Sequence, residues 1–96
     1  MVSAPRWRNK PDANQPDIVN ALEKVGAKVY DASQTGGGFP DLLVEYRSCF
    51  YLLECKTGKR KLNKDQQEFH WKFKRGPIYV VRSPQEALEA VGVDCG

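Results

Sequence analysis

Residues 39–56 read FPDLLVEYRSCFYLLECK, and this stretch contains two apolar runs separated by the dipeptide Arg47-Ser48. Each run has the length and composition of a β-strand, and two polar residues between them are enough for a tight turn. We therefore predict strands over residues 42–46 and 50–55, paired as an antiparallel hairpin. This hairpin supplies two neighbouring strands of a sheet, around which the rest of the chain must fold.

Ionisable residues stand at the ends of these runs, where a half-buried strand would normally carry valine or isoleucine. Asp41 follows a proline, which fixes the backbone approach, so Asp41 opens the first strand. Glu54 and Lys56 lie two residues apart, and both point to one face because strand side chains alternate. Two carboxylates beside an ammonium can bind a hard divalent cation and orient or deprotonate a water molecule.

Each of these residues also has a purely structural interpretation. Asp41 can cap a turn after the proline. Glu54 ends a run that is expected to be buried, and an unpaired buried carboxylate is costly. Lys56 can satisfy Glu54 as a simple ion pair, so these three residues alone leave both interpretations open.

The rest of the chain divides into elements at helical apolar spacings, glycine and proline stops, and short β-branched runs. We predict strands over residues 28–32 and 78–81, and helices over 14–25, from Asn63 or Asp65 to about 74, and over 83–91. The order α-β-β-β-α-β-α predicts an α/β fold. Its mixed four-stranded sheet is flanked by helices, and a helical crossover leads to the last strand.

The chain of 96 residues is long enough for one domain with a modest core. We assign residues 14–96 to this domain and residues 1–13, which lack apolar periodicity, to a basic N-terminal arm. No apolar run approaches the roughly 18 residues that a membrane span needs, and no signal-peptide core precedes the domain. We therefore expect an intracellular, cytoplasmic protein with no membrane partner.

Cysteine and histidine are too few for a disulfide framework or a zinc site. The three cysteines form no Cys-x-x-Cys pair, and His70 is the only histidine. Cys55 alternates with the two ionisable residues beside it, so its thiol is expected to face the packed side of the sheet. For His70 we expect a packed or surface position rather than a role as general base.

Positive charge is concentrated in one part of the sequence, although the net charge is only +3. Residues 56–75 contain eight lysines or arginines against two acidic residues, and Arg6, Arg8 and Lys10 add to the arm. Such clustering is typical of a protein that binds a polyphosphate such as nucleic acid. A solvated helix face explains the charge equally well, so charge alone leaves the choice open.

The joint spacing is more specific than any of these features. Pro40-Asp41, an interval of twelve residues, and then Glu54-Cys55-Lys56 before a basic loop and helix together resemble the PD-(D/E)xK nuclease superfamily. More narrowly, the chain resembles the VRR-NUC group, the virus-type replication-repair nucleases, which include small single-domain phage proteins. Three further stretches carry the narrower resemblance: Asn14-Gln15, residues 35–41 (TGGGFPD) and Leu62-x-x-x-Gln66.

The resemblance implies a restriction-endonuclease-like α-β-β-β-α-β core and a site that holds Mg²⁺ or Mn²⁺. Asp41, Glu54 and the main-chain carbonyl of Cys55 are the implied metal ligands. Lys56 is expected to position the attacking water or to stabilise the charged transition state. Relatives usually add an acidic residue on the first helix, and at the aligned position this chain has the neutral Gln15.

Two further residues enter the site by resemblance. Gln66 lies near the site in relatives, and Thr35 matches a position where resolvase-like relatives place a hydroxyl. A local hydrogen bond at a helix start and a loop hydroxyl without a role are the structural alternatives. Asp12 and Asp17 are candidates for the missing acidic charge, but on a helix Asp17 points about 200° away from the Gln15 position.

The implied activity is metal-dependent hydrolysis of phosphodiester bonds in DNA during replication, repair or recombination. The expected substrate is branched DNA, such as four-way (Holliday) junctions or flaps. Relatives this small usually act as homodimers, so a homodimer or higher homo-oligomer is expected. The expected phosphate contacts come from basic side chains: Arg6, Arg8, Lys59, Arg60, Lys61 and Lys64. The neutral Gln15 leaves an alternative, a DNA-binding module with the nuclease fold and weak or no catalysis.

Overall fold

The computed structural model describes residues 14–93, which form three helices and four strands. In chain order these are α1 (Asn14–Lys24), β1 (Lys28–Asp31), β2 (Leu42–Tyr46), β3 (Cys49–Cys55), α2 (Lys64–Lys72), β4 (Ile78–Val81) and α3 (Pro84–Ala90). The predicted α/β fold is confirmed, and each element ends within two residues of the predicted position. The predicted arm over residues 1–13 lies outside the described residues. Within residues 14–93, none of the helices is long and apolar enough to cross a membrane.

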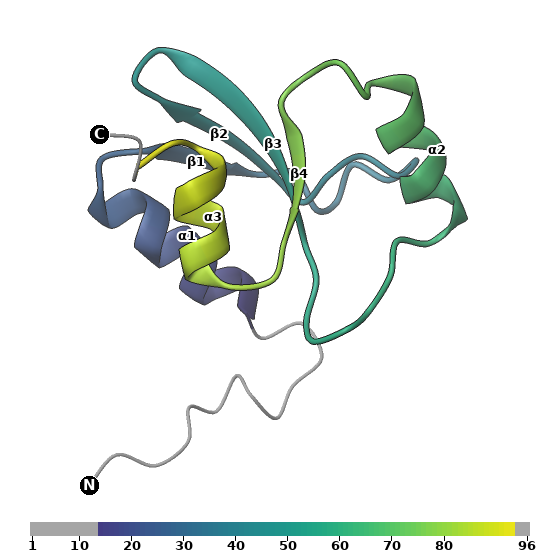
Figure 1. Ribbon diagram of the computed structural model, residues 1–96, viewed down its shortest axis with the longest axis horizontal. Coiled ribbons are helices and arrows are strands. Elements are labelled where there is room, and N and C mark those ends of the chain that lie inside the picture. The colour runs from purple at the N-terminus through teal and green to yellow at the C-terminus, as the bar shows by residue number, and fades with distance from the viewer. Residues whose placement is uncertain (1–13, 94–96) are drawn as a thin grey trace, which may run out of the picture.

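The four strands form one mixed sheet in the order β1-β2-β3-β4 (Figure 1). β1, β2 and β3 make the predicted antiparallel meander, and β4 returns parallel to β3 after the α2 crossover. In the hairpin, Leu42 pairs with Leu53. Asp41 and Glu54, one residue further along each strand, therefore lie at the same end of the hairpin.

The hydrophobic core lies between one face of the sheet and the pair α1 and α3, which lie side by side in Figure 1. Period-two alternation places Leu42, Val44 and Leu53 on this face, and all three are fully buried. From α1, Ile18 and Leu22 stand one helical turn apart and are buried against them. Burying a side chain of this size contributes about 1.5–3 kcal/mol, which gives this layer most of the fold's stability.

α2 lies apart from α1 and α3, near the opposite face of the sheet, and none of its residues is buried (Figure 1). It is held by the glycine-rich loop that leads into β2. Gly38 has φ +82, and a Cβ there would stand 2.2 Å from the Asp65 main-chain oxygen. The Phe39 and Phe69 rings meet edge to face at 5.3 Å. The loop before Asp41 and the start of α2 are therefore packed together by backbone contact.

The turn between β2 and β3 has the mirror-image geometry that two-residue hairpins favour. Arg47 has φ 51 and Ser48 has φ 71, the left-handed values that glycine or asparagine adopts most readily. The Ser48 N–H donates to Glu45 Oε2 at 2.8 Å, which partly offsets the strain. The antiparallel pairing of β2 and β3 imposes this turn geometry, although Arg47 and Ser48 are residue types that rarely adopt positive φ values.

Candidate active site

A polar pocket of about 370 Å³ lies at the end of the hairpin where β2 begins and β3 ends. Its walls come from the starts of α1 and α2, from the two strands, and from the loops on either side of them. Ten residues line it: Asn14, Gln15, Ser33, Asp41, Glu54, Cys55, Lys56, Arg60, Asn63 and Gln66. The pocket therefore brings together Asp41, Glu54 and Lys56, as the spacing predicted, with residues from four other segments.

A hydrogen bond from the main chain of β3 holds Asp41 in place immediately before β2. Its Oδ2 accepts a hydrogen bond from the Cys55 N–H at 2.8 Å, and its main-chain oxygen accepts one from the Ala32 N–H at 2.7 Å. The carboxylate is thus oriented by a main-chain donor rather than by a flexible side chain. The structural alternative, a simple turn cap, does not describe this contact, because the donor lies fourteen residues along the chain.

Glu54 is a nearly fully buried carboxylate, with 1 % of its surface exposed. Its Oε2 accepts from Gln66 Nε2 at 2.9 Å and lies 4.0 Å from Lys56 Nζ, whereas no donor reaches its Oε1. Burial, followed by the charge and hydrogen bonding of Asp41, raises the pKa of Glu54 to about 8, and the charge of Lys56 opposes this rise. The ion pair therefore satisfies only part of what this carboxylate requires.

Lys56 is held by its main chain. Its N–H donates to the Val81 carbonyl at 3.1 Å, and its carbonyl accepts from Asn14 Nδ2 at 2.8 Å. Its side chain is 10 % exposed and lies within ion-pair distance of Glu54. The ammonium is therefore directed into the pocket rather than into solvent.

Gln66 has both of the functions that the sequence left as alternatives. At the start of α2 it forms a capping box with Asn63: each main-chain N–H donates to the other side chain's oxygen at 2.9 Å. The remaining end of the side chain, Nε2, donates to Glu54. The cap fixes the rotamer, and the fixed rotamer positions the donor over the carboxylate.

The first helix brings two residues to the pocket. Gln15 lines it as predicted, and Asp17 does not. Asn14 is 3 % exposed, and its Nδ2 donates to the Lys56 and Arg82 carbonyls at 2.8 and 3.2 Å. From the sequence, Asn14 stood out only as part of the stretch Asn14-Gln15 that carries the narrower resemblance, because nothing in a linear pattern identifies partners 42 and 68 residues away. Asp12 lies outside the described residues.

The hydroxyl that lines the pocket belongs to Ser33, and Thr35 is exposed and does not line it. Asp31 holds Ser33 in a local turn. The Asp31 Oδ1 accepts hydrogen bonds from the Ser33 N–H at 2.9 Å and from the Ser33 Oγ at 2.5 Å. An aspartate two residues before a serine is a known turn signal, and it could have identified Ser33 from the sequence.

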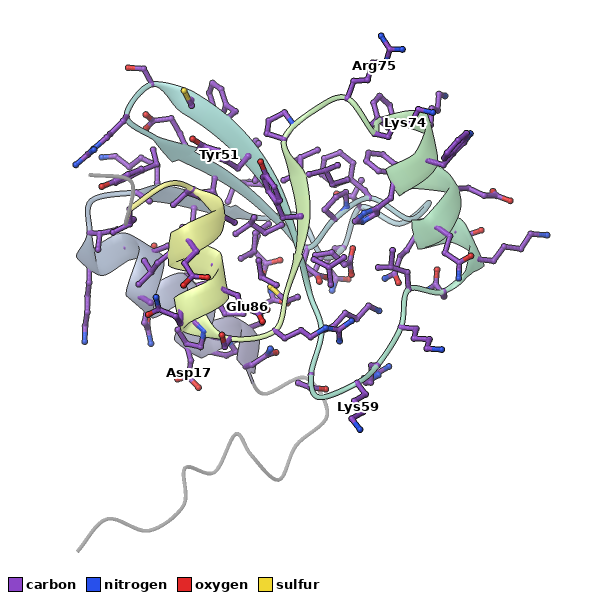
Figure 2. All side chains as sticks on the ribbon, viewed as in Figure 1. Asp17, Tyr51, Lys59, Lys74, Arg75 and Glu86 are labelled. Atoms are coloured by element: carbon purple, nitrogen blue, oxygen red, sulfur yellow. The ribbon has the colours of Figure 1, made fainter. Side chains whose placement is uncertain are left out.

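The predicted phosphate-binding residues divide between the pocket and the surface. Arg60 lines the pocket, while Lys59, Lys61 and Lys64 are exposed nearby in the chain. Figure 2 shows Lys59 at the outer edge of the loop between β3 and α2, with Lys74 and Arg75 at the far end of α2. The positive charge therefore forms two groups rather than one stripe. Arg6 and Arg8 lie outside the described residues.

Cys55 and His70 have the structural positions expected of them. Cys55 packs against the core, and burial raises the pKa of its thiol to about 12, so it is not a nucleophile near neutral pH. His70 lies one turn after Gln66 on α2, and its Nε2 is buried without a partner. Burial and the charge of Lys56 lower the pKa of His70, which keeps the imidazole neutral.

The donor set of the pocket suits a hard divalent cation. Asp41 and Glu54 supply two carboxylates, Glu54 Oε1 is a buried acceptor without a donor, and Gln15 adds a neutral amide. Across residues 14–93, no group of three or more histidine, cysteine, aspartate or glutamate side chains is arranged to hold a metal ion. Any cation here would therefore depend on two carboxylates together with neutral oxygen donors.

Comparison with known proteins adds no relative. No protein-family model and no curated protein matches this chain.

Proposed function

We propose that this protein is a metal-dependent DNA endonuclease of the PD-(D/E)xK type. The observation that carries the proposal is Glu54, a buried carboxylate with an unpartnered oxygen, set between Asp41 and Lys56 in an open polar pocket. Such an arrangement destabilises a protein that has no cation to bind. It is useful when a cation and an anionic substrate meet at the pocket.

Each of the main pocket residues would have a distinct role in metal-dependent hydrolysis. Asp41 and Glu54 would hold Mg²⁺ or Mn²⁺, with Gln15 and the Cys55 carbonyl as neutral donors. A bound ion would polarise the scissile phosphate and lower the pKa of water. Lys56 places an ammonium in the pocket, where it stabilises the negative charge that develops on the phosphate oxygens. Gln66 holds Glu54 in place through the Oε2 hydrogen bond.

The substrate we propose is branched DNA. Arg60 at the pocket and the lysines beside it contact phosphates, which give affinity without base recognition. Two of the three described helices, α1 and α3, cover the core, and α2 contributes Gln66 to the pocket. Selectivity for DNA shape, as at four-way junctions or flaps, fits this arrangement better than sequence-specific restriction does.

We propose that the enzyme acts as a homodimer or higher homo-oligomer, so that two sites can cut two strands. The sheet face away from α1 and α3 exposes 67 % of Tyr30 and 61 % of Phe50, beside an apolar groove of about 270 Å³. A patch of this kind is typical of a protein interface.

A second candidate function is a DNA-binding module without efficient catalysis. It is favoured by Gln15, which stands where relatives place a third acidic residue, and by the absence of a third carboxylate from the pocket lining over residues 14–93. With less negative charge the site would hold a divalent cation more weakly. Binding of DNA would then persist while cleavage stays slow.

A cleavage panel decides between these functions. Purified protein is incubated with linear duplex, flap and four-way junction DNA, with Mg²⁺, with Mn²⁺ and with a chelator. Cutting that requires the metal and prefers branched DNA is the expected result, and Lys56→Ala should slow it about 100- to 1,000-fold with binding kept. Lys28→Ala, an exposed lysine on β1, is the matched control. Binding without cutting under every condition would reject the nuclease and support the DNA-binding module.

A further inference from the structure

Arg82 links the segments that surround the pocket, although it does not line the pocket itself. Its Nη1 donates to the Gly58 carbonyl at 3.0 Å and to the Arg60 carbonyl at 2.7 Å. Both acceptors lie in the basic loop between β3 and α2. One guanidinium nitrogen therefore joins the end of β4 to the loop that carries the predicted phosphate contacts.

The main chain of Arg82 is fixed as firmly as its side chain. Its N–H donates to Glu86 Oε1 at 2.6 Å, and its carbonyl accepts from Asn14 Nδ2 at 3.2 Å. The other acceptor of Asn14 is the Lys56 carbonyl. Arg82 is thus anchored to α3 and α1, and through Asn14 it is connected to the residue that starts the loop.

Arg82 is an unusual anchor because it is positively charged and holds a loop that is itself basic. The loop it holds already carries Lys59, Arg60 and Lys61, and Arg82 adds a fourth cation whose guanidinium meets main-chain carbonyls of that loop. Both described hydrogen bonds of the guanidinium are donated to main-chain carbonyl oxygens. Its hydrogen bonds hold the loop in place, and the positive charge of all four residues favours the approach of a polyanion.

We propose that Arg82 is a positioning residue that orders the basic loop and keeps Arg60 at the pocket before DNA binds. The consequence for DNA binding rests on the proposed nuclease function, whereas the anchoring of the loop does not. An ordered loop loses less conformational freedom on binding, so substrate affinity rises without any direct contact from Arg82. Loss of the anchor should therefore raise KM and leave kcat nearly unchanged.

The test compares Arg82→Gln with Arg47→Gln. Both variants lose one positive charge, but Arg47 lies in the β2–β3 turn at the other end of the hairpin. Hydrogen–deuterium exchange is followed over residues 57–61 in the free protein, and cleavage kinetics are measured on the branched DNA that the wild type cuts best.

For Arg82→Gln we expect exchange in the loop to quicken about tenfold while the rest of the domain is unchanged. We expect KM to rise about fivefold with kcat within about twofold of the wild type. Arg47→Gln should change neither, and Arg82→Lys, which keeps the charge and one donor group, should recover part of both effects.

Unchanged exchange in Arg82→Gln would overturn the anchoring. Faster exchange with an unchanged KM, or an equal rise of KM in Arg47→Gln, would overturn its role in substrate binding. If Arg82→Gln does not fold, the same two readouts on Arg82→Lys decide. If the wild type cuts no DNA, the proposed function fails, and the exchange measurement still decides the anchoring independently.

Discussion

Replacing Glu54 with glutamine separates the cost of a buried carboxylate from its use in metal binding. The substitution keeps the shape of the side chain and the acceptor for Gln66, and it removes the charge. Burial, together with the charge and hydrogen bonding of Asp41, raises the pKa of Glu54 from an ordinary 4.5 to about 8 in the folded protein. The folded state therefore holds a proton that the unfolded chain releases, and stability falls as pH rises from 4.5 through 8.

The size of the effect follows from the two pKa values. Each unit of pKa difference corresponds to about 1.4 kcal/mol, so the loss between pH 5 and pH 7 is about 2–3 kcal/mol. For a domain whose total stability is on the order of 5–15 kcal/mol, this is a large fraction. We expect Glu54→Gln to be more stable than the wild type at pH 7, by about 2–3 kcal/mol more than at pH 5.

The assay is urea unfolding at several pH values, with and without Mg²⁺. Comparing the two proteins at each pH cancels the titrating groups that do not interact with Glu54. Mg²⁺ should stabilise the wild type most above pH 7, where it competes with the bound proton, and it should not stabilise Glu54→Gln. Glu23→Gln, which removes an exposed carboxylate from α1, is the matched control. Parallel stability curves for wild type and Glu54→Gln would refute the reasoning.

Three further predictions concern the loop beside the site, the hairpin turn and the proposed interface. Gly38→Ala should lower the free energy of unfolding by at least about 2 kcal/mol, because its Cβ meets the Asp65 main chain. Gly37→Ala, where the added Cβ meets no atom, should lower it by about 1 kcal/mol in the same thermal unfolding experiment. Equal losses in the two variants would contradict this. Ser48→Gly should raise stability by about 1 kcal/mol by relieving a positive φ, and Ser48→Ala should not. Phe50→Glu should shift the protein to monomer in sedimentation experiments, and a wild type that is already monomeric would disprove the proposed interface.

The hairpin and its three ionisable residues were predictable because strand periodicity and turn length are local properties. The same holds for the Gln66 cap, which the spacing from Asn63 indicates. The contacts of Asn14 and Arg82 were not predictable, because a buried amide and a guanidinium gain partners only when distant segments meet. The position of Ser33 in the pocket was not predictable either, because it depends on where the loop after β1 meets the hairpin, although the local turn made by Asp31 fixes its backbone.

Two charge arrangements of opposite sign lie next to each other in this fold, and each suits a charged ligand. Glu54 is a buried acid whose Oε1 lacks a donor, and the loop that Arg82 holds carries three further cations. A divalent cation would relieve the first, and a polyanion would bind to the second. Selection for stability alone does not favour the first arrangement, since an amide in place of Glu54 would remove its cost. The proposed substrate would bring a metal ion and a phosphate backbone to the same pocket and would account for both, and for this reason we favour a phosphodiesterase over a simple ion pair.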